Sequence, residues 1–175
     1  MADGRGVSRP GPQGRLVEFT ASAVVTGRVK HVFDVLTDWP RQTAWVPATV
    51  VARAQDSPVA AVGERFVGTT TFGPFVLVDA MEVVDRVPPD GTEGPGAVGR
   101  VRVAKTGDVF GGDVDIVVAP AGPGRVRVDW TERILVRPRW LARLAGLGGP
   151  VPGLVGKLAF EAVLRTASDD LRGPS

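Results

Sequence analysis

The feature that most constrains the fold is a series of six strand-like segments between residues 48 and 136. Each segment is rich in β-branched residues, and glycine or proline turns separate several of them. The long crossovers that parallel strands require are absent from this region. The pattern therefore predicts consecutive antiparallel strands and excludes a doubly wound nucleotide-binding fold. The six segments are 48–55, 63–72, 75–87, 97–105, 108–119 and 125–136.

Further elements are expected on either side of these strands. Residues 17–25 alternate well enough for a first strand, and Thr26 stands where a helix N-cap is expected. The apolar residues of segment 28–39 recur at spacings of three and four, which indicates a helix that Pro40 should stop. We expect two short helices between the first and second strands. Residues 152–171 predict a long, largely covered C-terminal helix.

The composition is that of an ordinary globular protein. The chain has 175 residues, 43% hydrophobic and 23% charged, which fits one domain. We place this domain at residues 16–172, between a disordered tail at 1–15 and a short tail at 173–175. A net charge of +2 disfavours nucleic-acid binding. The absence of cysteine excludes disulfides and thiolate metal sites, and we expect neither a metal nor a cofactor.

No segment resembles a signal peptide or reaches the roughly 18 apolar residues of a membrane span. We therefore expect a cytoplasmic protein without integral membrane association. One apolar patch, formed by Trp140, Leu141, Leu144 and Leu147, is compatible with a lid, a dimer surface or a peripheral membrane contact. These three alternatives stay open, and a homodimer is among them.

A two-residue turn at Gly73-Pro74 lets the side chains of the flanking strands be assigned to faces. We assign the face with the bulkier apolar side chains to the interior. Its expected cross-strand pairs are Phe72 with Phe75, Thr70 with Leu77, Gly68 with Asp79, and Phe66 with Met81.

The same counting from a turn at Thr106-Gly107 places Lys105 opposite Asp108, as a charge pair at the end of a hairpin, with contact to a ligand as the alternative. Lys105 then shares a face with Phe110. In the last strand, Trp130 and Glu132 should point inward, because they alternate with charged residues.

Asp79 and Glu132 are the sharpest functional candidates, since both are carboxylates on a face that is otherwise apolar. An unpaired charge is costly to bury, so each needs a partner or a raised pKa. The alternative interpretation is structural, with both groups solvated or salt-bridged near the open end of the sheet.

The glycine-rich segment, the histidine and the serines do not indicate a binding or catalytic site. Gly94, Gly96 and Gly99 match a dinucleotide-binding spacing, but they open a strand where that motif requires a helix. His31 is the single histidine, and its helical phase predicts a surface position. No serine lies in the sequence context of a hydrolase nucleophile.

The chain resembles the START-like superfamily, whose bacterial members are grouped as SRPBCC or polyketide cyclase/dehydrase and lipid-transport proteins. The resemblance covers about residues 16 to 171. The segments that carry it are VVTG, VFDVLTDWPRQTAWVP, VGERFVGTTTFGPF, AMEVVDRVPP, KTGDVFGG and VRVDWTERILV. It implies an α+β helix-grip fold, in which a curved seven-stranded antiparallel sheet wraps around a long C-terminal helix and encloses a cavity. Because the superfamily includes carriers, receptors and aromatase/cyclases, its fold does not select one function.

We expect the cavity to bind or carry an apolar or amphipathic small molecule. The alternative is a cyclase or dehydratase acting on a polyketide-like metabolite, with Asp79 or Glu132 as general acid or base. A third class, an interaction protein, would have a collapsed cavity. The expected ligand-binding residues are Trp45, Phe66, Thr70, Phe72, Leu77, Asp79, Met81, Phe110, Trp130 and Glu132.

Overall fold

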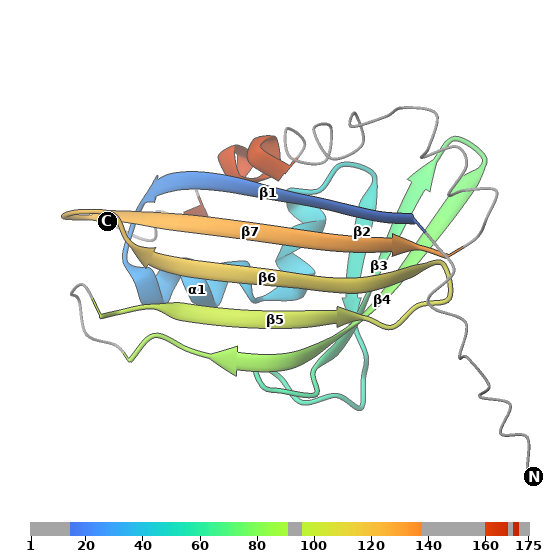
Figure 1. Cartoon of the computed structure of the whole chain (residues 1–175), viewed down its shortest axis with the longest axis horizontal. Coiled ribbons are helices and arrows are strands. Elements are labelled where there is room, and N and C mark those ends of the chain that lie inside the picture. Colours follow the sequence, from blue (N-terminus) through green and yellow to red (C-terminus); the bar gives the residue numbers. More distant parts are fainter. Residues whose placement is uncertain (1–14, 91–95, 138–159, 168–169, 172–175) are drawn as a thin grey trace, which may run out of the picture.

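The computed structural model describes residues 15–90, 96–137, 160–167 and 170–171. Its strands form one antiparallel sheet in the order β1-β7-β6-β5-β4-β3-β2, which confirms the predicted seven-stranded sheet (Figure 1). The strands are β1 (Arg15–Thr26), β2 (Thr49–Arg53), β3 (Arg65–Phe72), β4 (Phe75–Val87), β5 (Gly99–Lys105), β6 (Phe110–Pro120) and β7 (Arg125–Val136). The apolar patch at 140–147 and the tails at 1–14 and 173–175 lie outside the described residues.

Two short helices connect β1 to β2, as expected: α1 (Val29–Leu36) and the 3₁₀ helix η1 (Trp39–Ala44). The predicted N-cap at Thr26 is wrong. Thr26 is the last residue of β1, and Arg28 occupies the N-cap position without a side-chain hydrogen bond. Pro40 lies in the first turn of η1, where a missing N–H costs nothing.

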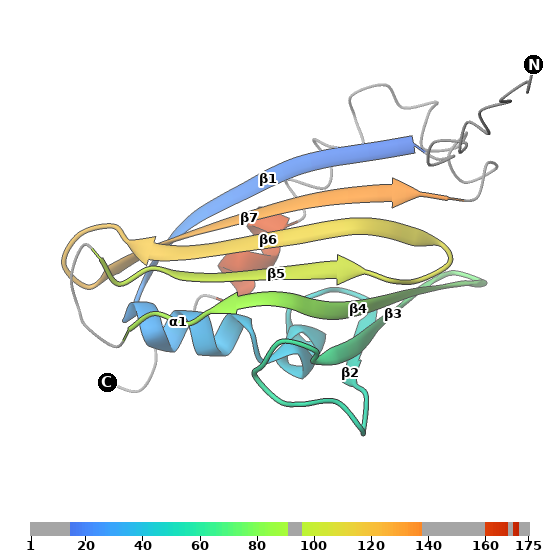
Figure 2. The same ribbon diagram turned by 60° about the horizontal axis from the view of Figure 1, so that its bottom comes forward.

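The described C-terminal residues are helical at 160–166 and again at 170–171. Residues 152–159 lie outside the described part, so the long C-terminal helix is not confirmed. The described helix lies on the same side of the sheet as α1 (Figure 2). Two hydrogen bonds hold Asp170: the His31 ring donates to its carbonyl at 3.0 Å, and Trp45 Nε1 donates to Oδ2 at 3.0 Å. His31 is therefore half-buried rather than fully at the surface.

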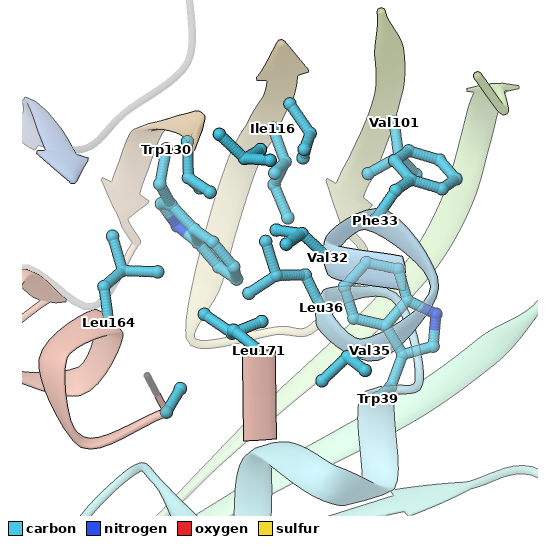
Figure 3. Packing of buried hydrophobic residues seen from close by; sticks show 14 of the residues in the cluster. Val32, Phe33, Val35, Leu36, Trp39, Val101, Ile116, Trp130, Leu164 and Leu171 are labelled. Carbon is cyan, nitrogen blue, oxygen red and sulfur yellow. The ribbon is translucent and has the colours of Figure 1, made fainter. Parts of the chain in front are cut away.

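The core fills one end of the concave face of the sheet. Figure 3 shows side chains of α1 facing those of the sheet and the C-terminal segment: Val32, Phe33, Leu36, Val101, Ile116, Trp130, Leu164 and Leu171. A Cβ atom at Gly99 would lie 2.5 Å from Cδ2 of Phe33. The third glycine of the GPGAVG segment is thus explained by packing against Phe33.

The β3–β4 hairpin has the predicted register. Gly68 pairs with Asp79 and Phe66 with Met81, and Val76 and Val78 on the opposite face are exposed. Phe75, expected on the inward face, is also exposed, because it lies at the tip of the hairpin. Phe66 is buried and its ring stacks on Trp39, with centroids 4.4 Å apart and an interplanar angle of 6°. Phe66 is therefore part of the core at the η1 end of the sheet.

The predicted β5–β6 register is wrong. Lys105 pairs with Gly112 rather than with Asp108. The N–H of Thr106 donates to the carbonyl of Ala80 at 2.7 Å, so the chain stays bonded to β4 where a turn was expected. The shift is an even number of residues, and the inward face of β6 is therefore the predicted one.

Among the described helices, none is both long enough and apolar enough to cross a bilayer.

Phe66→Ala should lower the free energy of unfolding by about 3–5 kcal/mol, because it removes a buried ring stacked on Trp39. Urea denaturation followed by tryptophan fluorescence measures the change. Phe75→Ala is the matched control in the same hairpin, since its side chain is 61% exposed and its loss should cost only about 0.5 kcal/mol. A loss below about 1 kcal/mol for Phe66→Ala would contradict this assignment.

Candidate functional site

A cavity of about 240 Å³ lies on the concave side of the sheet, at the end that the core does not fill. Strands β2 to β7, η1 and the C-terminal helix contribute to its walls, and most of the lining is apolar. The described lining residues are Gln42, Val46, Thr49, Val51, Gly68, Thr70, Asp79, Met81, Lys105, Phe110, Val114, Trp130, Glu132, Ile134 and Phe160.

Three charged side chains meet in this wall, and we call them the Lys105 triad: Lys105, Asp79 and Glu132. Lys105 Nζ lies 2.5 Å from Asp79 Oδ2 and 2.8 Å from Glu132 Oε1. The Lys105 side chain is only 4% exposed, Glu132 is 7% exposed and Asp79 is 20% exposed. The two inward carboxylates thus have the partner that their burial requires, and a single ammonium serves both.

The strand order explains how one lysine reaches both carboxylates. Asp79 is on β4, next to β5, whereas Glu132 is on β7, with β6 in between. The residue of β6 that pairs with Lys105 is Gly112. Gly112 has φ +105°, and a Cβ there would lie 1.9 Å from the carbonyl oxygen of Arg133 on β7. Any side chain at this position would be strained, so the backbone of β6 beside the Lys105 triad requires glycine.

The triad keeps Lys105 charged. Burial acts to lower the pKa of the ammonium, but attraction to Glu132 and Asp79, with the hydrogen bonds between them, outweighs burial. The pKa of Lys105 therefore lies above its ordinary value of 10.5. At neutral pH, Lys105 is a donor of hydrogen bonds and not a free amine.

The structure brings together six of the ten predicted ligand-binding residues around the cavity: Thr70, Asp79, Met81, Phe110, Trp130 and Glu132. Trp45 lines a separate void of about 10 Å³ beside the C-terminal helix. Phe66 lies in the core, and Leu77 is half-buried but not among the lining residues. The Phe72 side chain lies outside the described part of the structure.

Sequence reasoning missed several lining residues. Lys105 faces inward by strand parity, but the misplaced turn gave it Asp108 as a partner. Val114 and Ile134 follow the period of two, and could have been found by extending the inward faces of β6 and β7. Gln42 and Phe160 come from helices, and no periodicity within the sequence places those helices against the sheet.

No group of three or more histidine, cysteine, aspartate or glutamate side chains within the described residues could hold a metal ion.

Lys105→Met should destabilise the protein by about 3–5 kcal/mol at neutral pH, because it leaves two carboxylates buried without a counter-ion. Lys30→Met makes the same chemical change in an exposed pair with Asp34 and should cost at most about 1 kcal/mol. Urea denaturation of both variants and the wild type measures the difference.

The pH dependence of that difference separates charge from packing. Since the pKa of Lys105 is raised, its charge stabilises the fold fully below pH 10.5, and this contribution is lost as the pH rises through the raised value. The difference in the free energy of unfolding between wild type and Lys105→Met should therefore become smaller only in strong alkali. If this difference stays constant up to the pH at which the protein unfolds, the methionine destabilises the fold by disrupting packing and not by removing a charge.

No family model and no curated protein matches the sequence. Solved structures match its fold at low identity. A hypothetical protein from Helicobacter pylori is 19% identical, with 98% of this chain and 99% of that chain covered and a TM-score of 0.64. The di-domain aromatase/cyclase StfQ of the steffimycin biosynthetic pathway is 14% identical over 89% of this chain and 50% of that one, with a TM-score of 0.61.

Norcoclaurine synthase from Thalictrum flavum, in complex with dopamine and hydroxybenzaldehyde, is 13% identical to this chain. The match covers 91% of this chain and 93% of that one, with a TM-score of 0.52. Together with the seven-stranded antiparallel sheet, these likenesses show that the chain has the START-like (SRPBCC) fold that its sequence resembles.

Proposed function

We propose that the protein binds or carries an apolar or amphipathic small molecule in the cavity of the concave face. The observation that carries this proposal is an apolar cavity into which a few buried polar groups converge. Such a combination is typical of small-molecule sites, where apolar walls provide affinity and a few polar groups fix orientation. The Lys105 triad supplies the polar groups, and Phe110, Trp130 and Phe160 supply aromatic walls.

The cavity volume limits the size of the ligand. Pockets for drug-sized ligands commonly measure about 300–1,000 Å³, and this cavity measures about 240 Å³. A ligand with one or two fused aromatic rings, or an aliphatic chain of similar volume, fits this space. Norcoclaurine synthase, which shares the fold, has been solved with two single-ring molecules, dopamine and hydroxybenzaldehyde. This supports a ligand of about one aromatic ring.

Ile134→Trp should weaken the binding of a neutral amphipathic probe, 1-naphthalenemethanol, by at least about tenfold, since the indole occupies space in the cavity. Leu135→Trp is the matched control, because the next residue of β7 points to the opposite face of the sheet. Titration calorimetry measures binding, and urea denaturation verifies that both variants fold. Equal binding by the two variants, or no binding by the wild type, would contradict the proposal.

A second candidate function is a cyclase or dehydratase reaction on a polyketide-like metabolite. The specific observation is that two carboxylates and an ammonium lie in the wall of one cavity, where acid–base chemistry needs such groups. Because Lys105 stays protonated at neutral pH, it is suited to polarising a carbonyl. The proton transfers fall to Asp79 or Glu132.

Turnover of a cyclisable polyketide analogue should fall by about 10²-fold or more in Asp79→Asn or in Glu132→Gln, if either carboxylate transfers a proton. Product formation is measured by chromatography across a range of pH, with 1-naphthalenemethanol binding as the control for an intact cavity. Turnover with the wild-type pH profile in both variants would exclude this assignment.

A further inference from the structure

The Lys105 triad carries more negative than positive charge. Two carboxylates and one ammonium give it a net charge of −1, and Lys105 is the single cation among the described residues that line the cavity. The triad also has more hydrogen-bond acceptors than donors. Two carboxylates offer roughly eight lone-pair sites, whereas an ammonium has three N–H groups. The triad therefore has too few donors for its acceptors.

One acceptor of the triad has no partner. Asp79 Oδ1 is shielded from solvent, and no described residue donates a hydrogen bond to it. The χ2 torsion of an aspartate is broad, so the carboxylate can turn to present either oxygen. Leaving a buried acceptor without a donor is unfavourable, and more so when the acceptor is charged. A donor supplied from the cavity would remove this cost.

Glu64 shows what a structural carboxylate looks like in the same protein. Its side chain is fully buried, Oε1 accepts from Arg53 Nε at 2.5 Å, and Oε2 accepts from the N–H of Ala60 at 2.8 Å. Both oxygens of Glu64 thus have protein donors, and it lines no described part of the cavity. The unsatisfied oxygen belongs to Asp79, one of the two carboxylates in the cavity wall.

The remaining polar groups of the cavity do not fill this need. The hydroxyl groups of Thr49 and Thr70 lie 2.8 Å apart and bond to each other. Gln42 Nε2 donates to the carbonyl of Leu36 at 3.3 Å. These groups bond to protein partners. Trp130 Nε1 is a buried N–H of the cavity lining without a hydrogen-bond partner, so it does not donate to Asp79 either. A donor for Asp79 is therefore expected to come with the ligand.

We propose that the ligand carries a hydrogen-bond donor head, a protonated amine above all, which binds Asp79 and neutralises the Lys105 triad. This inference rests on the proposed function, because it names the chemical class of the molecule that the cavity takes. An amine contributes both the missing donor and the missing positive charge, and charge-assisted hydrogen bonds are the stronger kind. A carboxylate or phosphate head would add negative charge beside two buried carboxylates, and the site should reject it.

Three probes of the same ring system test the inference on the full chain by titration calorimetry: 1-naphthylmethylamine, 1-naphthalenemethanol and 1-naphthoate. We expect the amine to bind about tenfold or more tightly than the alcohol, and the carboxylate at least about tenfold more weakly than the alcohol. Equal affinities, or tightest binding of the carboxylate, would overturn the inference and leave the proposed function standing. Binding of none of the three would overturn both.

Asp79→Asn keeps the shape of the side chain and removes its charge, so the preference for the amine over the alcohol should fall to about threefold or less. Asp85→Asn, an exposed position on the same strand, is the matched control and should keep the full preference. Glu132→Gln is the second variant, which also brings the triad to zero net charge and should reduce the preference. Wild-type preference in both Asp79→Asn and Glu132→Gln would overturn the assignment.

Discussion

The burial of the Lys105 ammonium is the interaction on which the cavity depends. Removing an isolated ammonium from water costs several kcal/mol, and only well-placed opposite charges offset that cost. Here the opposite charges come from two strands, since Asp79 lies on β4 and Glu132 on β7. The same contact separates the two carboxylates by a positive charge, without which they would repel each other. The three charges thus depend on one another, because removing any one of them leaves a buried charge without its ion-pair partner.

The concave face of the sheet is divided into a packed end and an open end. At the packed end, α1 and η1 pack large side chains against the sheet, as Trp39 of η1 does by stacking on Phe66 of β3. At the open end, the inward position that pairs with Asp79 is a glycine, Gly68, which lines the cavity. A small residue at this position leaves room that a bulkier one would occupy. The cavity therefore results from the side chains of the sheet as much as from the placement of the helices.

Much of the sheet could be predicted, because side chains alternate with a period of two and tight turns fix register. The Gly73-Pro74 turn placed Asp79 on the inward face correctly. The β5–β6 turn could not be located, since Thr106 continues to bond with Ala80 of β4, a contact remote in sequence. The contact between Lys105 and Glu132 reaches across an intervening strand, and no local sequence pattern predicts a contact of this kind. The fold was more predictable than the site, because the site depends on these remote contacts.

The charge pattern of the triad also bears on how β5 finds its place in the sheet. Val101, Val103 and Lys105 all face inward, so sliding β5 by two residues would preserve its apolar face. Hydrophobicity alone therefore discriminates poorly between the native alignment and this slipped one. After such a slip, the ammonium would leave both carboxylates, and three buried charges would lose their partners at once. The group that prepares the cavity for a ligand thus also penalises the nearest misfolded arrangement of the sheet.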